Sequence, residues 1–341
     1  MAPGNRKAPQ RAESSESDYT LLEFQQDFPD DETCLVWLWN TRFNLGDDAA
    51  HCERCGEIRT FRRYAAKQQR QDWTCTACGL HVHPTAGTIF HKSSTSLALW
   101  FYAMYLMTST RCGISAKQLE RELGVTYKTA WRMFTLIRNE LMAPDGKVLS
   151  GRVEMDETYV GGKPRASDKA KFSKSPAGRQ SAAIAWLHDK KTTVFGMVER
   201  NNHILRDGKT KAEITRHGKI AAYVVPKNPQ QSIVGHIAKQ VASDTVIYTD
   251  DARIYDRLEG DGFTHRTINH SEGTYVSGAI HTQQIEGFWS LVKRGIDGTH
   301  HSVSPKWLQG YVNEYVWRYN HRGEGRSMFS QLLLRSAFPV R

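Results

Sequence analysis

The chain has 341 residues, of which 39% are hydrophobic and 24% are charged. This composition is typical of a globular protein of roughly two to three domains, and it excludes a collagen-like, coiled-coil or wholly disordered chain. The net charge of +10 is compatible with a polyanionic partner, although many proteins share such an excess. Residues 1–18 are rich in proline, serine and charge, which predicts a disordered tail, and no secretory signal is expected. A helical segment is expected over residues 19–50, with helices near 20–28 and 31–40.

Four of the six cysteines form two CxxC pairs, Cys52 with Cys55 and Cys75 with Cys78. In a chain without a secretion signal, two such pairs predict a zinc ribbon over residues 51–92, in which four thiolates bind a structural Zn²⁺ ion. A redox role for the pairs is the alternative, and the ribbon-like spacing disfavours it. Strands are expected at 60–64 and 72–74.

Other residues of this region are less specific. The basic residues between the two pairs would form either a phosphate-contacting surface or a merely solvated one; they are Arg59, Arg62, Arg63, Lys67 and Arg70. His81 and His83 could be spare ligands, but a structural role is favoured. Cys34 and Cys112 have no partner at ligand spacing and are expected to be buried thiols.

Residues 93–145 predict a helix-turn-helix DNA-binding region. A buried helix is expected at 97–107, well short of the ~20 residues that span a membrane. Ser115 would then cap one helix, Gly124 would supply the turn and Thr126 would cap the second helix. The residues that this second helix would present to DNA are Tyr127, Lys128, Thr129 and Arg132. An ordinary helical pair in a bundle is the alternative.

The remainder, residues 150–341, predicts an α/β domain in which helices flank a mixed sheet. Strands are expected at 152–159, 181–188, 192–198, 221–225 and 245–249, and helices at 283–294, 305–319 and 327–336. The basic segment 163–180 is expected to be a mobile loop that either contacts DNA or is only solvated.

Three acidic residues could converge on one site. Asp156 lies within a predicted strand, Asp250 follows another, and Glu286 lies on a helix beside apolar residues. Inward-facing carboxylates are costly unless they are paired or bind a cation, and hard oxygen ligands suit Mg²⁺ or Mn²⁺. Two ions about 4 Å apart would support phosphoryl transfer.

Each acid also has an ordinary structural interpretation. Glu154 shares the face of Asp156 in an alternating strand, while Glu157 would point to the opposite face, so any of the three could lie outward. Asp251, next to Asp250, is expected to cap the following helix. Glu286 could form a salt bridge with Lys293 or Arg294.

Five sequence motifs resemble those of the IS1595-type (ISXO2-like) insertion-sequence transposases, which are of the DDE class and related to the Merlin transposases. They are residues 153–162 (VEMDETYVGG), 248–250 with Tyr255, 281–289 (HTQQIEGFW), 293–295 (KRG) and 315–322 (YVWRYNHR). The N-terminal zinc ribbon matches the family as well, and the resemblance extends from about residue 20 onward.

This resemblance implies an RNase H-like catalytic core and assigns Asp156, Asp250 and Glu286 as its metal-binding triad. Lys293 matches the basic residue that follows the last acid, two helical turns after Glu286, where it can reach a phosphate. Some family branches have Asn at the third position. Gln283 corresponds to that position here and is a poor Mg²⁺ ligand, and the spacing to Lys293 favours Glu286.

Two neighbouring residues and one further cation complete the expected site. His281 would contact the site or the attacking water, or else merely begin the helix. Trp289 is expected in the core rather than stacked on DNA. Arg294 joins Lys293 as a candidate DNA contact.

The activity expected from the resemblance is that of a DNA transposase. It would bind terminal inverted repeats, cleave DNA and join it to target DNA, as a cytoplasmic, nucleoid-associated protein that is at least a dimer and has no membrane partner. Two other functions stay open: a catalytically inactive, domesticated transposase that only binds DNA, and an RNase H-like nuclease.

Overall fold

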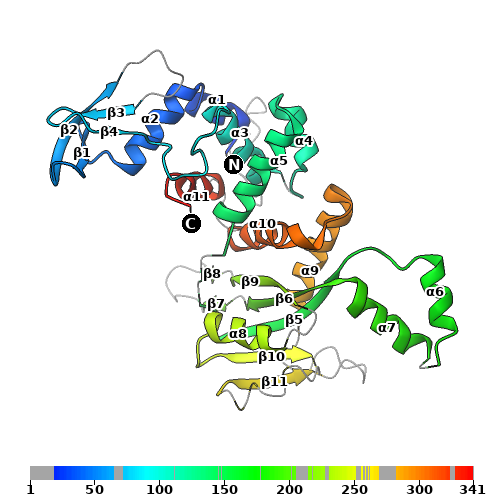
Figure 1. Cartoon of the computed structure of the whole chain (residues 1–341). Coiled ribbons are helices and arrows are strands. Elements are labelled where there is room, and N and C mark those ends of the chain that lie inside the picture. Colours follow the sequence, from blue (N-terminus) through cyan, green and yellow to red (C-terminus); the bar gives the residue numbers. More distant parts are fainter. Residues whose placement is uncertain are drawn as a thin grey trace, which may run out of the picture. The chain divides into compact units, whose positions relative to one another are not determined.

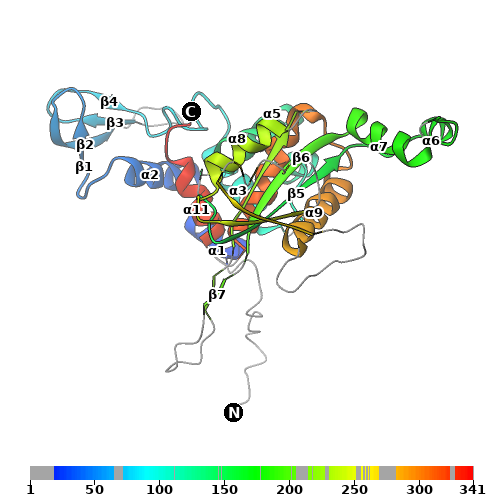
Figure 2. The same ribbon diagram turned by 90° about the horizontal axis from the view of Figure 1, so that it is seen from below.

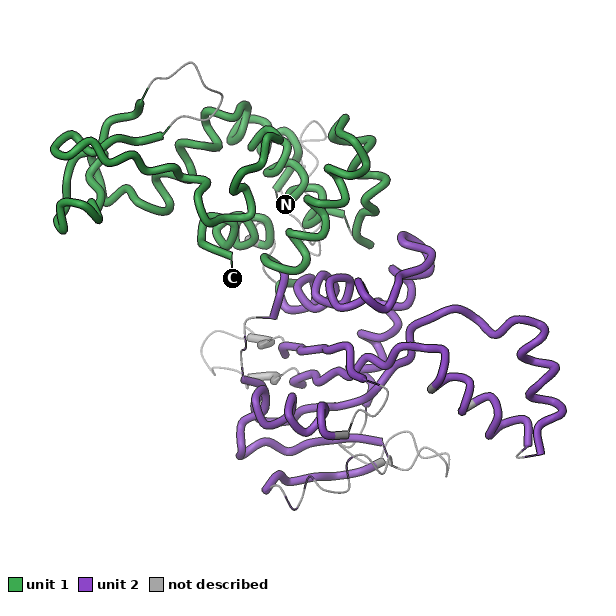
Figure 3. Tube along the Cα trace, viewed as in Figure 1, with its two compact units in different colours: residues 1–141, 321–341 green, residues 142–320 purple. Residues whose placement is uncertain are grey.

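The computed structural model describes residues 19–64, 72–110, 112–144, 146, 148–176, 178–200, 202–204, 214–216, 218–226, 230–250, 255, 258, 260, 262–268, 282–322 and 327–340. Two compact units divide the chain (Figure 3). Unit 1 comprises Met1–Leu141 and His321–Arg341, and unit 2 comprises Met142–Asn320. The predicted tail, residues 1–18, lies outside the described residues.

Unit 1 begins with two helices whose starts are fixed by side-chain caps. Helix α1 (Leu21–Asp27) follows Thr20, which forms a capping box with Glu23. Helix α2 (Asp31–Arg42) follows Asp30, whose carboxylate accepts from the Thr33 backbone N–H at 2.8 Å. Both helices were expected from the sequence, and both are present.

A small antiparallel sheet follows, built in the order β1 (Ala49–Cys52), β2 (Glu57–Tyr64), β3 (Asp72–Cys75) and β4 (His81–Val82). The ring of Trp39 on α2 stacks on Trp73 of β3, with centroids 4.8 Å apart and an interplanar angle of 6°. This contact joins the sheet to the preceding helix.

The rest of unit 1 is helical. Helices α3 (Leu97–Ser109), α4 (Ala116–Leu123) and α5 (Tyr127–Leu136) are followed by a single π-helical turn, Ile137–Leu141. Helix α11 (Ser327–Ser336) comes from beyond unit 2 and packs on α3 (Figure 1). Its Phe329 ring stacks on Tyr19 with centroids 5.2 Å apart and meets Tyr105 edge-on.

Unit 2 is centred on a five-stranded sheet in the order β11-β10-β5-β6-β9. Its strands are β5 (Arg152–Val160), β6 (Thr192–Glu199), β9 (Ile220–Val225), β10 (Val246–Asp250) and β11 (Thr264–Ile268). β5, β6 and β9 pair antiparallel, whereas β10 pairs parallel with both β5 and β11. A separate short ladder joins β7 (Asn202–Ile204) to β8 (Ile214–Arg216).

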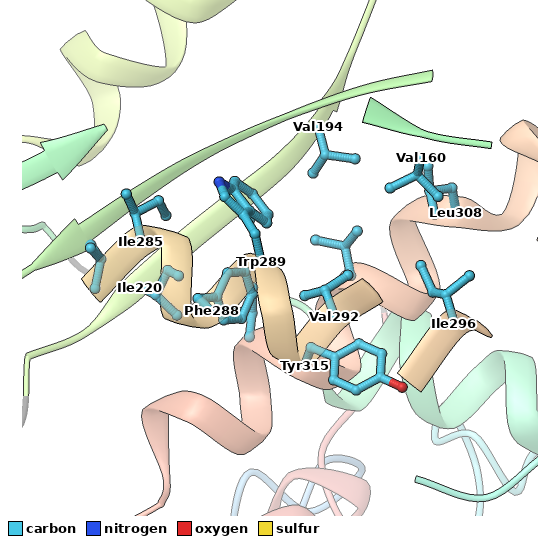
Figure 4. Close-up of a cluster of buried hydrophobic side chains, with 14 residues drawn as sticks. Val160, Val194, Ile220, Ile285, Phe288, Trp289, Val292, Ile296, Leu308 and Tyr315 are labelled. Carbon is cyan, nitrogen blue, oxygen red and sulfur yellow. The ribbon is translucent and has the colours of Figure 1, made fainter. Parts of the chain in front are cut away.

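Helices cover both faces of this sheet. The alternation along β6 places Val194 and Val198 against helices α9 (Gln283–Gly295) and α10 (Leu308–Asn320), in the cluster that Figure 4 shows. Phe195 and Met197 face the opposite way, in a cluster that includes residues of α8 (Gln230–Gln240). A π-helical turn, Ile296–His300, and a 3-10 turn, Pro305–Trp307, connect α9 to α10. Unit 2 is thus a mixed α/β structure, in agreement with the predicted class.

Two sequence predictions in unit 2 are wrong. The expected loop 163–180 contains helix α6 (Ala166–Ser173), and the expected strand 181–188 lies inside helix α7 (Arg179–Lys190). The two helices pack through Phe172 and Trp186, whose rings meet edge-on at 6.2 Å. A short apolar run does not distinguish a strand from a helix by its period, and here the alanine-rich run Ser181–Ile184 favours a helix.

Glycine at two positions of α9 allows a matched stability test. A Cβ at Gly295 would lie 1.7 Å from the Tyr315 Oη, whereas a Cβ at Gly287 would meet no atom within 4 Å. We therefore expect Gly295→Ala to lower the free energy of unfolding by about 1–3 kcal/mol through overpacking. Gly287→Ala should instead raise it by about 0.5–1 kcal/mol, because alanine is the better helix former. Urea denaturation of both variants checks this, and equal effects would contradict it.

Candidate active site and metal centre

The four cysteines of the two CxxC pairs converge in unit 1. Their sulfur atoms all lie within 4.8 Å of one another, and the Sγ atoms of Cys52 and Cys78 are 3.5 Å apart. Each pair makes the same turn: Gly56 N–H donates to the Cys52 carbonyl at 2.8 Å, and Gly79 N–H donates to the Cys75 carbonyl at 3.0 Å. Both glycines have φ of +73°, which favours glycine. The repeated CxxCG sequence therefore forms two equivalent knuckles.

This cluster has the chemistry and size of a zinc site. A tetrahedral ion with Zn–S bonds of about 2.3 Å places its sulfurs about 3.8 Å apart, within the spread found here. Burial opposes ionisation of Cys75, but the backbone N–H groups of Cys78 and Ala77 lower the pKa of its thiol to about 7. The cluster can therefore hold a thiolate-binding metal ion such as zinc.

The remaining histidines and cysteines of unit 1 are not part of the cluster. Asp72 lies 3.1 Å from His81 Nδ1 and 3.7 Å from His83 Nε2, which fits the structural role expected for both. Cys34 is fully buried, as predicted. Cys112 is exposed, so its prediction as a buried thiol is wrong; it lies in the loop before α4, where the sequence gives no burial pattern.

Two of the three predicted acids lie side by side in the sheet of unit 2. In the parallel pair of β5 and β10, Glu154 is opposite Tyr248. Two residues further along each strand are Asp156 and Asp250, which the alternation of side chains places on the same faces as Glu154 and Tyr248 of these neighbouring strands. Asp156 accepts a hydrogen bond of 3.0 Å from Trp289 Nε1 on α9, which identifies that face as the one covered by α9.

The indole of Trp289 can reach Asp156 because the residue that pairs with Asp156 on β6 is a glycine, which leaves room for the ring. Gly196 on β6 pairs with Asp156, and a Cβ at Gly196 would lie 2.6 Å from the Trp289 ring. Trp289 is itself buried, as predicted, and Figure 4 places it between α9 and the sheet.

Helix α9 brings the third acid and the basic residues to the same place. Glu286 lies in its first turn and accepts from the Thr282 hydroxyl at 3.1 Å. An open pocket of about 720 Å³ is lined by Asp156, Glu286 and Lys293, together with Glu157, Thr158, Trp289, Ser290, Arg294, Asp297 and Gly298. Lys293 and Arg294 are exposed to solvent. One cavity therefore contains acidic and basic side chains side by side.

The acids influence one another electrostatically. Burial, the nearby Asp250 and, more weakly, Glu286 raise the pKa of Asp156 to about 6. Burial also raises the pKa of Glu157 to about 7, with contributions from Asp156 and Asp250, although Tyr255 opposes this by donating a hydrogen bond of 2.6 Å. A bound cation would relieve this accumulation of negative charge. Within the described part of the chain, however, only the four cysteines form a group of three or more ligands as close as 4.8 Å.

Three acidic residues near the site were missed or left undecided by sequence reasoning. Glu157 and Asp297 line the pocket. Glu154 is fully buried: its Oε1 accepts from Arg200 Nε at 2.8 Å, and its Oε2 accepts from the backbone N–H groups of Gln284 and Ile285. Strand alternation gives only the faces of Glu154 and Glu157, so their partners could not be deduced from it. Asp297 lies in the π-helical turn after α9, to which alternation does not apply. Gln283 begins α9 and is exposed, whereas His281 and Asp251 lie outside the described residues.

The predicted DNA-contacting residues of unit 1 lie on α5. Lys128 and Arg132 are exposed, and the Arg132 guanidinium lies 5.9 Å from the Trp100 ring centroid. The Thr129 backbone N–H and hydroxyl both face Thr126, the helix cap. Gly124 ends α4 with φ of +62°, so the short connection has the expected turn residue.

Part of the basic surface on the ribbon is already neutralised. Arg63 pairs with Glu32 at 2.7 Å, and its guanidinium lies 5.6 Å from the Trp73 ring centroid. Arg59 pairs with Glu57. Lys67 and Arg70 lie outside the described residues. These pairs favour a solvated, structural role for the two paired arginines.

The raised pKa values predict how stability changes with pH. Because the folded protein holds protons on Asp156 and Glu157 that the unfolded chain releases, the free energy of unfolding should fall as pH rises from about 4 to about 7. Asp156→Asn with Glu157→Gln should flatten this part of the curve. Urea denaturation between pH 4.5 and 7.5 without divalent metal measures it, and identical pH profiles for wild type and variant would contradict the assignment.

Comparisons with known proteins agree with these features. Residues 148–320 match the model of the ISXO2-like transposase domain. An uncharacterized protein in transposable element ISH50 of Halobacterium salinarum is 29% identical over 276 residues, covering 80% of this chain and 85% of that protein. An uncharacterized transposase-like protein of Haemophilus influenzae is 30% identical over 108 residues, covering 30% of this chain and 82% of its own length.

The family match covers more than half of the chain and nearly the whole of unit 2. This protein therefore belongs to the ISXO2-like, IS1595-type transposase family. In the described residues, no helix combines the length and apolarity that crossing a membrane requires.

Proposed function

We propose that the protein is an active DNA transposase, which binds the terminal inverted repeats of an insertion sequence, cleaves DNA and transfers the cut strand to target DNA. The observation that carries this proposal is the position of Asp156 and Asp250 on one face of neighbouring strands, beneath the helix that bears Glu286, in a member of a transposase family. The pocket that holds two of these acids also contains Lys293 and Arg294.

The catalytic domain is proposed to be RNase H-like. Three antiparallel strands, β5, β6 and β9, are followed by β10 and β11, which extend the sheet parallel to β5 on its other side. This is the strand order that an RNase H-like core requires, with α8 between the third and fourth strands and α9 after the fifth. It places the two strand-borne acids at adjacent central strands, where a site can form.

Asp156, Asp250 and Glu286 would hold the catalytic Mg²⁺ or Mn²⁺ ions, because carboxylate oxygens are the ligands that these hard cations prefer. When bound, such ions stabilise the charge that develops on the attacking and leaving oxygens of a phosphodiester. Lys293, two helical turns after Glu286 on the same face of α9, would contact a DNA phosphate. Arg294 would contribute a second contact in the same pocket.

The proposed chemistry needs no covalent protein intermediate. A water molecule attacks the phosphodiester at the element end, and the bond to the 3′ oxygen breaks, which leaves a 3′-hydroxyl and a 5′-phosphate. The 3′-hydroxyl then attacks a target phosphodiester and displaces its 3′ oxygen, so one bond forms for each bond broken. The chain's own residues bind and orient the phosphates for both steps.

Unit 1 is proposed to recognise the element ends. Helices α4 and α5 would act as a helix-turn-helix, with Lys128, Thr129 and Arg132 near DNA, and the cysteine knuckles would form a zinc ribbon. Base contacts from α5 would give specificity, while lysine and arginine contacts to phosphates would give salt-dependent affinity. Bringing two ends together would require at least a homodimer.

A strand-transfer assay tests the proposal. Purified protein is incubated with a labelled, pre-cleaved element end and plasmid target, with Mg²⁺, with Mn²⁺ or with EDTA. We expect joined products with either ion and none with EDTA. Cleavage without joining would identify a nuclease, and specific binding of the end without either reaction would identify a DNA-binding protein; both results would overturn the proposal.

A further inference from the structure

Residues 161–191, which we call the basic arm, form a helical insertion in the hairpin between β5 and β6. Helices α6 and α7 project away from the sheet in two perpendicular views (Figures 1 and 2). Gly161 lies at the base of the arm, where a Cβ would approach the Lys191 Cα to 3.4 Å. The close approach brings the two connections of the arm together, so the insertion leaves the sheet as one unit.

The surface of the arm is strongly basic. Its acidic residues are only Asp168 and Asp189, and both have local partners: Asp168 accepts from the Arg165 backbone N–H at 3.0 Å, and Asp189 pairs with Lys190 at 2.7 Å. Lys191, at the base of the arm, is half-buried. The other basic side chains are exposed and form no ion pair with a described residue; they are Lys163, Arg165, Lys169, Lys171, Lys174 and Arg179. An arm of this charge has a fixed, unneutralised positive potential.

The arm also leaves the sheet at the edge where the acidic residues lie. Because β5 and β10 run parallel, β5 ends at the same edge of the sheet as Asp250, the last residue of β10. Asp156 lies four residues before the end of β5, where the arm begins. Thr158, between Asp156 and the arm, also lines the pocket. A duplex that reaches the pocket would therefore pass close to the base of the arm.

We propose that the basic arm binds the phosphate backbone of duplex DNA beside the catalytic pocket, without reading its sequence. Lysine and arginine bind phosphates through their charge, and phosphate contacts carry no sequence information. This inference deepens the proposed function and rests on it for the identity of the DNA, but the binding itself requires no chemistry.

The test is equilibrium binding of the full chain to a random-sequence duplex without divalent metal, between 50 and 200 mM salt. The double variant Lys171→Glu with Lys174→Glu should reduce the steepness of the plot of log K against log salt concentration by about 1.8, because two phosphate contacts are lost. If wild type and variant bind equally at 1 M salt, this corresponds to a loss of about 60-fold in affinity at 0.1 M salt. Lys239→Glu with Lys306→Glu is the control, because it changes the charge of the same unit equally at exposed positions elsewhere.

The outcomes separate this inference from the proposed function. If the arm variant and the control bind with the same affinity and slope, the basic arm does not contact DNA, whatever the wild type does in strand transfer. If the arm variant alone loses affinity while the wild type fails to join DNA, the arm is a DNA-binding element and the proposed catalysis is wrong.

A second inference rests on a different observation, the buried Glu154. This single carboxylate links three elements: it belongs to β5, it pairs with Arg200 after β6, and it accepts the N–H groups of Gln284 and Ile285 at the start of α9. The Arg200 guanidinium lies 4.2 Å from the ring centroid of Tyr248 on β10. Each of these contacts lies within two residues of one of the three acids. Glu154 is two residues before Asp156, and Tyr248 is two residues before Asp250. Ile285 directly precedes Glu286.

We infer that Glu154 and Arg200 are positioning residues that hold the three acid-bearing elements in register. The carboxylate satisfies two N–H groups that would otherwise lack an intrahelical partner, and this fixes where α9 begins over the sheet. Loss of the charge would let the first turn of α9 shift, and Glu286 would move with it. The metal affinity of the site should then fall more than the stability of the fold.

Mn²⁺ titration by calorimetry on the full chain tests this together with strand transfer. Glu154→Gln should weaken Mn²⁺ binding at the carboxylate site by about tenfold and raise the Mn²⁺ concentration needed for joining. Glu199→Gln is the control, since Glu199 is another buried acid of the sheet that bonds to Ser150 and Lys219 instead of α9. Arg200→Lys gives a second variant if Glu154→Gln does not fold. Equal Mn²⁺ affinities for Glu154→Gln and Glu199→Gln would overturn the inference.

Discussion

Asp250→Asn should abolish strand transfer, with a rate loss of at least about 10³-fold, while binding to the element end is retained. The asparagine keeps the size of the side chain at the end of β10 but removes the charge that would hold a metal ion. Stabilisation of the reacting oxygens by such an ion is worth several kcal/mol, and each 1.4 kcal/mol corresponds to a factor of ten. Asp156→Asn and Glu286→Gln should have comparable effects in the same assay.

The control for this series is Asp244→Asn, which removes the same charge at an exposed position just before β10. It should join DNA at the wild-type rate. Gln283→Ala should also retain activity if Glu286 is the third ligand. Activity in Glu286→Gln combined with its loss in Gln283→Ala would reverse that assignment.

Removing the metal from the cysteine cluster should unfold the knuckles and their sheet. Structural zinc contributes about 10–16 kcal/mol to the folding of small zinc domains, far more than the β1–β4 sheet can compensate. Cys55→Ser should therefore lose bound zinc and the near-ultraviolet dichroism of the stacked pair Trp39 and Trp73. Zinc content and dichroism are measured together, with and without a chelator.

Cys112→Ser is the matched control, because this thiol is exposed and lies outside the cluster. Zinc content and dichroism should be those of the wild type. If Cys55→Ser keeps the Trp39–Trp73 signal after chelation, the sheet folds without metal and the zinc assignment loses its structural role.

Local sequence signals were sufficient where a residue type determines its own geometry. The two CxxC pairs predicted the four-cysteine cluster. The Ser115, Gly124 and Thr126 signals predicted the two ends of α4 and the start of α5. The strand-borne Asp156 and Asp250 could be proposed as a pair, but their common face depends on the β5–β10 register, which joins segments about ninety positions apart.

Tertiary partners explain what the sequence did not reveal. The helix α7 was predicted as a strand, and its partner Phe172 lies in a segment predicted to be a loop. Helix α8 and strand β11 were not predicted, because each has few apolar residues. Ile233 and Ile237 of α8 are buried through their contacts with the sheet, which the local sequence does not reveal. Glu154 could not be distinguished from Asp156 by alternation, because both lie on one face of β5 and only the start of α9 and Arg200 determine the role of Glu154.

The return of α11 to unit 1 has a consequence for synthesis on the ribosome. Phe329 completes an aromatic cluster with Tyr19, Phe24 and Tyr105, so the core of the first-made unit stays open until residues 327–336 have been translated. Unit 2 ends at Asn320 and can close earlier. A nascent chain would thus complete unit 2 before unit 1, and a frameshift after residue 320 would leave the core of unit 1 open although most of that unit is translated first.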